Sequence, residues 1–133
     1  MSTLSRLFAQ LERGTAGLLV ISESEAPLIP FVWPPNLPFN QSVLLVACNQ
    51  PADTPVENVA FAGFWSRLTH NPDPSDPIAQ AATRRFRALG NLLTKHLVEL
   101  RVHRVGVIDI ATYVVGETNA GRIVGLATRQ IET

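Results

Sequence analysis

Two glutamates spaced two positions apart, Glu23 and Glu25, are the residues whose types and spacing first suggest chemistry. They follow the apolar run 17–21 in the motif Ser-Glu-Ser-Glu, and Pro27 closes the segment. Two carboxylates with pKa values split by their surroundings can act as the acid and base of a hydrolase. Ser22 and Glu25 also match a capping box, in which two side chains satisfy the free amides of one helical turn. A third interpretation is a rigid acidic tip that contacts a partner. The residues alone leave all three open.

The other candidates for catalysis or metal binding lack the spacing that such sites need. No pair among the histidines has the spacing of a metal motif; they are His70, His96 and His103. Gly116–Gly121 contains two glycines but joins predicted strands, whereas a phosphate-binding loop joins a strand to a helix. Cys48 lies in an apolar segment, which indicates inert packing. No Gly-x-Ser-x-Gly motif marks a nucleophilic serine either. Apart from the Glu23 and Glu25 pair, we therefore expect no enzyme, no cofactor and no metal site of the protein's own.

The composition is that of a globular protein and is compatible with a reducing compartment. The 133 residues suffice for one domain, 1–133, and the 11 basic and 11 acidic side chains give a formal net charge of zero. A neutral chain has no overall field to attract nucleic acid or an anionic membrane. The single cysteine excludes an internal disulfide framework. The amphipathic segment 1–10 is unlike a secretory signal, so we expect a soluble cytoplasmic protein with no membrane partner.

Helical and strand patterns alternate along the first half of the chain. Apolar residues at helical spacing predict a first helix from Leu4 to Leu11, with one apolar face that should dock on a sheet. A strand is predicted over Leu28–Trp33, and Pro30 indicates that it lies at an edge of the sheet or begins irregularly. The short apolar segment Ser42–Cys48 is compatible with a strand or a helix, and possible caps at Asn40 or Ser42 favour a short helix. Further expected elements are a strand over Val56–Ala62 and one or two helical turns over Gly63–Leu68.

A long helix follows a stiff, proline-rich loop over Asn71–Pro77. Asp76 is the expected N-cap and Pro77 the first helical residue. The apolar stripe of this helix comprises Ile78, Ala82, Phe86, Leu89, Leu93, Leu97 and Leu100, and the other side carries Arg84, Arg87, Asn91 and Lys95. That basic side could bind phosphate or a partner. A solvated helix surface is the simpler interpretation, because no aromatic residues interleave the basic ones.

The chain ends in strands. The β-branched, alternating segments Arg104–Val115 and Arg122–Ile131 are joined by Gly116–Gly121, which predicts a hairpin. Helices precede, interrupt and follow the strands, and the last two strands are antiparallel. The pattern therefore predicts an α+β fold with a mixed, mainly antiparallel sheet covered by helices.

Several motifs, in order along the chain, resemble the nuclease A inhibitor family of bacterial proteins. They are Gly17-Leu18-Leu19, Ser22-Glu23-Ser24-Glu25 with Pro27, Phe31-Val32-Trp33, Phe64-Trp65-Ser66-Arg67, Tyr113-Val114-Val115-Gly116-Glu117-Thr118, Ala120-Gly121 and the final Glu132-Thr133. The resemblance runs over nearly the whole chain. It implies a three-layer α/β/α sandwich that inhibits a sugar-non-specific DNA/RNA endonuclease of the ββα-metal type.

The resemblance also implies roles for two residues. Glu23 would enter the nuclease active site in place of the scissile phosphate, and Thr133 would approach the catalytic magnesium. This fits physical expectation, because a nuclease cleft accepts an anion beside Mg²⁺, and Mg²⁺ prefers oxygen ligands. We further expect Glu25, Glu117 and Glu132 to share an acidic face with Glu23 that complements a basic substrate channel.

One loop departs from the family pattern. The family's second contact uses a tryptophan beside acidic residues, whereas the matching loop Thr69–Pro77 has Asp73 and Asp76 and no aromatic residue. We include both aspartates among the expected partner contacts. The missing aromatic anchor leaves an alternative function open: an inhibitor-like module of the same fold that binds a different bacterial protein.

Overall fold

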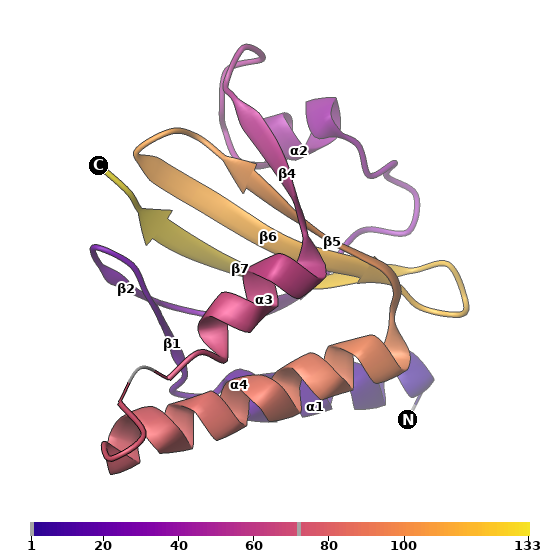
Figure 1. Cartoon of the computed structure of the whole chain (residues 1–133). Coiled ribbons are helices and arrows are strands. Elements are labelled where there is room, and N and C mark those ends of the chain that lie inside the picture. The colour runs from indigo at the N-terminus through magenta and orange to yellow at the C-terminus, as the bar shows by residue number, and fades with distance from the viewer. Residues whose placement is uncertain (1, 72) are drawn as a thin grey trace.

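The computed structural model describes residues 2–71 and 73–133. The elements in chain order are α1 (Thr3–Thr15), β1 (Leu19–Ile21), β2 (Glu25–Pro27), β3 (Ile29–Val32), α2 (Gln41–Ala47), β4 (Val56–Ala60), α3 (Phe61–Leu68), α4 (Pro77–His96), β5 (Val98–Val105), β6 (Asp109–Glu117) and β7 (Ile123–Ile131) (Figure 1). This mixture of helices and strands confirms the α+β class. No helix in these ranges is long and apolar enough to cross a membrane.

The strands form a five-stranded sheet and a small two-stranded one. The large sheet has the order β3-β7-β6-β5-β4, and β1 pairs only with β2. Every pairing between described strands is antiparallel, which confirms the expected mainly antiparallel sheet and its closing β6–β7 hairpin. β3, which contains Pro30, lies at one edge as predicted, because proline cannot donate a ladder hydrogen bond.

The long helix begins where the sequence predicts. The carboxylate of Asp76 accepts hydrogen bonds from the backbone N–H groups of Ile78 and Ala79, at 3.0 and 3.3 Å, and Pro77 is the first helical residue. The predicted apolar stripe is wrong at both ends. Ile78 is 82 % exposed, and Leu100 lies in β5 because the helix ends at His96.

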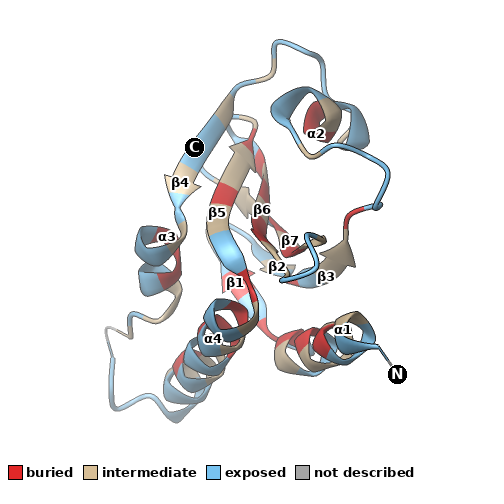
Figure 2. Ribbon diagram, turned by 90° about the vertical axis from the view of Figure 1, so that its right-hand side faces the viewer, coloured by how far each residue is buried: buried red, intermediate tan, exposed pale blue. Residues whose placement is uncertain are grey.

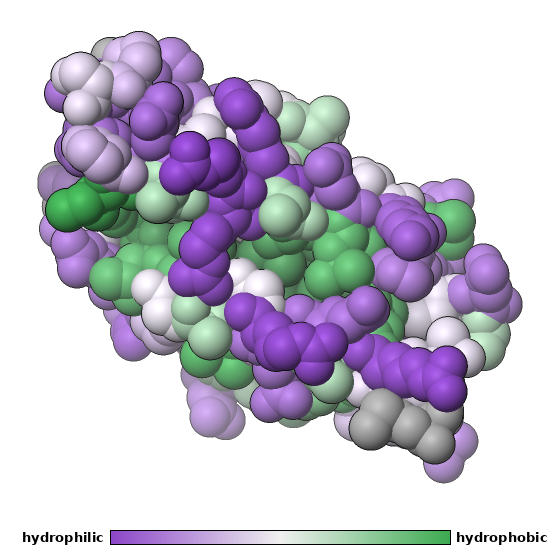
Figure 3. Space-filling view, turned by 90° about the horizontal axis from the view of Figure 1, so that it is seen from below, coloured by the Kyte–Doolittle hydropathy of each residue, from purple (hydrophilic) through white to green (hydrophobic). Residues whose placement is uncertain are grey.

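One face of the large sheet carries α1, α3, α4 and the β1 strand. Side chains from these elements and from alternate positions of β5, β6 and β7 form the main core; its fully buried members include Leu11, Val20, Leu93, Val102, Val114, Val124 and Leu126. Figure 2 shows the buried sides of α1 and α4 turned inward. Arg84, Arg87, Asn91 and Lys95 are exposed on α4, as expected for a solvated surface. Figure 3 views this side of the molecule, where hydrophilic groups surround hydrophobic patches.

The opposite face is covered by α2 and the loop that precedes it. Figure 2 places α2 across the sheet from α3. Asn40 caps α2, as predicted, by accepting a hydrogen bond from Val43 N–H at 3.0 Å. Trp33, Leu44, Leu45 and Val105 form a second buried cluster here. Cys48 packs against this cluster, with its Sγ 2.9 Å from the hydroxyl of Tyr113.

The predicted strand Arg104–Val115 is two strands. β5 ends at Val105 and β6 begins at Asp109, with Gly106 in the turn at φ 113°. A Cβ at Gly106 would lie 2.5 Å from the carbonyl oxygen of Asp109, so the turn requires glycine. Val107 and Ile108 are apolar and continue the strand-like pattern, so the sequence does not indicate a turn at this point.

Candidate functional site

The Ser-Glu-Ser-Glu segment is the tip of the β1–β2 hairpin. Ile21 pairs with Glu25, and the N–H of Ser22 donates to the carbonyl of Ser24 at 2.8 Å. Residues 22–24 therefore form a tight strand-to-strand turn. The capping-box interpretation is wrong, since no helix starts here and Glu25 is part of β2.

The hairpin tip is attached to the end of β7. Glu23 N–H donates to the carbonyl of Ile131 at 3.2 Å, and Ile131 N–H donates to the hydroxyl of Ser22 at 2.9 Å. Two hydrogen bonds to Ile131 thus fasten the acidic tip to the last strand. In Figure 1 the β1–β2 hairpin and the C-terminus lie on the same side of the molecule.

Glu23 and Thr133 form one hydrogen-bonded unit. The hydroxyl of Thr133 donates to Glu23 Oε1 at 2.7 Å, and its backbone N–H donates to Glu23 Oε2. These bonds to the charged form lower the pKa of Glu23 below its ordinary value, first through the hydroxyl and then through the backbone. The exposed carboxylate is therefore ionised and fixed in direction, although it lies 110 residues from its partner in sequence.

Arg104 holds the segment that carries Thr133. Its side chain is only 14 % exposed and forms ion pairs with Glu57, at 3.1 Å, and with Glu132. Its Nε donates to Gln130 Oε1 at 3.3 Å, and the Glu132 N–H donates to the carbonyl of Ile108 at 2.9 Å. The hydrogen bond that Arg104 donates to Glu132 is the largest contribution that raises the pKa of Arg104. Arg104 is therefore a positioning residue for the tail.

A groove of about 370 Å³ opens beside Glu23. Its walls are apolar side chains of β1, β4, α3 and β7 with two arginines; the lining includes Ile21, Val59, Phe64, Leu68, Ile131, Arg67 and Arg104. Exposed apolar side chains lie on both sides of the tail: Ile21 in the hairpin is 72 % exposed, and Val107 and Ile108 in the β5–β6 turn are 66 % and 56 % exposed. An ionised tip with an apolar border is an arrangement suited to a protein partner.

The structure brings together some of the predicted acidic contacts and separates others. Glu132 joins Glu23 at the groove, and Glu25 is exposed on the same hairpin. The expectation that Glu117 shares this face is wrong. Glu117 ends β6 opposite Ile123, whereas the tip lies at the Ile131 end of the same nine-residue pairing, about 27 Å away at ~3.4 Å per residue.

The two loop aspartates lie at the start of α4 and have local roles. Asp76 caps the helix, and the exposed carboxylate of Asp73 accepts hydrogen bonds from the N–H and hydroxyl of Ser75 at 3.1 and 2.5 Å. These bonds lower the pKa of Asp73. Pro72, in the middle of the loop expected to contact a partner, lies outside the described residues.

The geometry favours binding over catalysis. A general acid needs a carboxyl group with a raised pKa, whereas both oxygens of Glu23 accept hydrogen bonds that lower its pKa. Within residues 2–71 and 73–133, no group of three or more His, Cys, Asp and Glu side chains is placed to hold a metal ion. Of the three interpretations, the rigid acidic tip is the one that this geometry supports.

No pattern in the sequence singles out Arg104 or the Ser22–Ile131 hydrogen bond. Arg104 lies inside the alternating segment predicted as a strand and has the appearance of an ordinary polar strand residue. A weak signal existed: its side chain faces an adjacent strand with Glu57, and opposite charges commonly pair across strands. That signal required the β4–β5 register, which composition does not supply.

Comparison with known families identifies the family of the chain. The sequence model of the family described as nuclease A inhibitor-like protein matches residues 5–133, nearly the whole chain. The match includes both the hairpin tip with Glu23 and the tail with Thr133. A comparison with curated proteins gave no match. The chain therefore belongs to the nuclease A inhibitor-like protein family.

Proposed function

We propose that this protein inhibits a metal-dependent, non-specific DNA/RNA endonuclease of the ββα-metal type and has no catalytic activity of its own. Membership of an inhibitor-like family fits a nuclease inhibitor role. The single observation that supports the finer proposal is the contact between Glu23 and Thr133, two residues from opposite ends of the sequence. In the proposed complex Glu23 occupies the position of the scissile phosphate and Thr133 lies towards the partner's Mg²⁺.

The chemistry of the tip suits that position. A nuclease cleft binds an anion next to a hard cation, and a carboxylate offers oxygens without a bond that the enzyme can cleave. Because Thr133 already fixes the carboxylate of Glu23, little conformational entropy remains to be lost on binding. The border formed by Ile21, Val107 and Ile108 excludes water from the charged contact, which strengthens it.

Attraction to a basic cleft must come from local charge. The chain as a whole is neutral, so its total charge provides no long-range steering. Glu23, Glu25 and Glu132 cluster around the tip, although Arg104 pairs with Glu132 and reduces its effect. We therefore expect the association rate to depend modestly on salt. The acidic tip should stabilise the complex chiefly once the inhibitor and the nuclease are already in contact.

Titration of the protein into such an endonuclease, with DNA cleavage as the readout, tests the proposal. Cleavage should stop at one inhibitor per nuclease. Glu23→Ala should raise the inhibition constant by at least about thirtyfold, as loss of an interface hot spot does. Arg87→Ala, on the exposed side of α4, is the matched control and should inhibit like the parent protein. Equal inhibition by Glu23→Ala would refute the phosphate-mimic mechanism.

A second function is favoured by one observation. The loop Thr69–Pro77 has no aromatic residue to serve as an anchor, and Asp73 and Asp76 are hydrogen-bonded within the loop and helix start. The alternative is a module of the same fold that binds a different bacterial protein. If an excess of the protein leaves DNA cleavage unchanged, this alternative replaces nuclease inhibition.

A further inference from the structure

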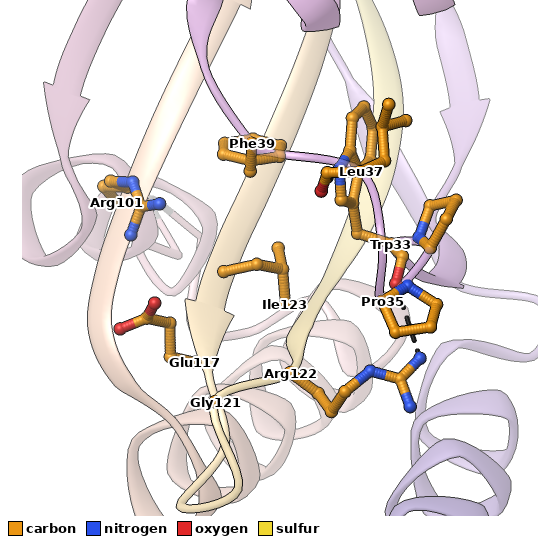
Figure 4. Close-up of a pocket in the computed structure, with 10 residues that line it drawn as sticks. Trp33, Pro35, Leu37, Phe39, Arg101, Glu117, Gly121, Arg122 and Ile123 are labelled. Carbon is orange, nitrogen blue, oxygen red and sulfur yellow. Dashed lines mark hydrogen bonds between the residues drawn. The ribbon is translucent and has the colours of Figure 1, made fainter.

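A separate cavity of about 250 Å³ lies at the other end of the sheet, next to Glu117. It lies between the loop that follows β3 and the strands β5, β6 and β7, and it is open to solvent; its lining includes Trp33, Leu37, Phe39, Arg101, Glu117, Arg122 and Ile123. Figure 4 shows Arg101 and Glu117 on one side of the cavity and Arg122 on the other, with Ile123 between them. The nuclease-inhibitor proposal uses none of these residues.

A local irregularity in β5 sets the position of Arg101. The pairing of β5 with β6 shifts register between Val98 and Arg101, and Glu99 has a positive φ of 56°. The carbonyl of Glu99 accepts a hydrogen bond from Arg101 Nη1 at 2.8 Å, and the guanidinium carbon lies 5.5 Å from the centre of the Phe39 ring. Bulges redirect side chains, and unusual backbone conformations cluster at functional sites. The irregularity thus presents a cation to the cavity.

Arg122 supplies a second cation with unused donors. Its Nη2 donates to the carbonyl of Trp33 at 3.5 Å, as drawn in Figure 4. Its Nε is buried and has no hydrogen-bond partner among the described residues. A buried donor without a partner costs free energy, and most such groups in native proteins are satisfied. An anionic ligand in the cavity would supply acceptors for this guanidinium.

The charges of the cavity define the ligand further. Two guanidinium groups and one carboxylate give it a formal charge of plus one, and Glu117 forms no ion pair within the described residues. A monoanion balances that charge, and guanidinium groups match the planar carboxylate. Glu117 offers an acceptor that suits a hydroxyl donor. Phe39, Trp33 and Ile123 offer apolar contact to the ligand's body.

We propose that this cavity binds a small hydroxylated monocarboxylate, with its carboxylate on Arg122 at one side and its hydroxyl on Glu117, beside Arg101, at the other. At ~30 Å³ per water, the cavity holds about eight water-sized groups, which restricts the ligand to a small molecule. That volume is below the range of about 300–1,000 Å³ typical of sites for drug-sized ligands. Ligand binding here is independent of nuclease inhibition.

The probes are 4-hydroxybenzoate, benzoate and phenol, which share a ring and differ in the two polar groups. Binding is followed in the ¹⁵N-labelled protein by the indole N–H resonance of Trp33, whose Nε1 donates to Leu37 O at 3.1 Å at the cavity wall. Trp65, which donates to Phe86 in the main core, is the internal control. We expect 4-hydroxybenzoate to shift the Trp33 signal with a Kd of about 1 mM or tighter, and benzoate and phenol to bind about tenfold more weakly.

Variants separate the site from non-specific binding. Arg122→Gln and Arg101→Gln should each weaken binding of 4-hydroxybenzoate about tenfold, whereas Arg129→Gln, an exposed arginine far along β7, should bind like the parent. Glu117→Gln should reduce the preference for 4-hydroxybenzoate over benzoate. The proposal is overturned if no probe gives a saturable Trp33 shift at about 10 mM. It is also overturned if benzoate binds as well as 4-hydroxybenzoate, or if both cavity variants bind like Arg129→Gln while retaining the parent's spectrum.

Discussion

Replacement of Arg104 by methionine tests the side-chain contacts that hold the C-terminal tail in place. Methionine retains much of the aliphatic stem but removes the guanidinium, and with it the ion pairs to Glu57 and Glu132 and the hydrogen bond to Gln130. The partner carboxylates are 64 % and 51 % exposed, so water solvates them well when the guanidinium is gone. The free energy of unfolding therefore falls less than it would on breaking a fully buried ion pair.

The magnitude follows from this exposure. An exposed ion pair is worth at most about 1 kcal/mol and a hydrogen bond to a charged group in a buried setting about 1.5–3 kcal/mol. With Arg104 itself only 14 % exposed, two contacts of about 1 kcal/mol each give a loss of about 2 kcal/mol in the free energy of unfolding. For 133 residues the unfolding entropy is about 280 cal/mol/K, so the Tm should fall by about 7 °C.

Thermal unfolding followed by circular dichroism measures this change. Arg129→Met is the matched control, because Arg129 pairs with Asp109 on the same sheet but is 66 % exposed. It should lower the Tm by no more than about 2 °C. Arg104→Met should also inhibit the nuclease less well, because Glu132 and Thr133 lose their anchor. If the two variants have the same Tm and the same inhibition constant, the assignment of Arg104 as the positioning residue is wrong.

Three further predictions follow from the tip and the sheet. Hydrogen bonds from Thr133 lower the pKa of Glu23, so the tail contact is stabilising above the ordinary glutamate pKa of 4.5 and is lost as the pH falls through the lowered value. Thr133→Val should raise the pKa of Glu23, measured by NMR from its carboxyl carbon. An unchanged titration curve would contradict the contact. Residues added after Thr133 emerge beside Glu23 and should weaken nuclease inhibition, whereas the same tag placed before α1 should not; equal potency of both tagged proteins counts against the role of the tail. Gly125→Ala places a Cβ 2.2 Å from the carbonyl oxygen of Val114 and should destabilise the protein by about 3 kcal/mol in chemical denaturation. Gly63→Ala, with open space in α3, should instead stabilise it by up to about 1 kcal/mol. A similar effect of both substitutions would show that the contact at Gly125 relaxes.

Local signals in the sequence were sufficient for the elements with clear start and stop residues. The caps Asp76 and Asn40 place α4 and α2 correctly, because each side chain satisfies backbone donors of its own helix. Pro30 places β3 at an edge for an equally local reason. The turn at Gly106 was missed because Val107 and Ile108 continue the apolar pattern although both are exposed.

The site depended on contacts that no local pattern reports. Resemblance to a family singled out Glu23 and Thr133, and the structure places them in contact. Charge complementarity to a basic substrate channel led us to group Glu117 with the other acids, but its position at the far end of β6 follows from strand register. Arg104 was missed for the same reason, since its partners come from β4, β7 and the tail. In this fold the site lies where strand ends that are distant in sequence meet, so strand pairing determines which charged residues are neighbours.

The mode of inhibition against a short DNA substrate tests the central claim most directly. If Glu23 takes the place of the scissile phosphate, inhibitor and substrate exclude one another. Added protein should then raise the apparent KM of the endonuclease and leave kcat unchanged, and saturating DNA should release the inhibitor. A fall in kcat at constant KM, or a stable complex of nuclease, DNA and inhibitor, would contradict the account.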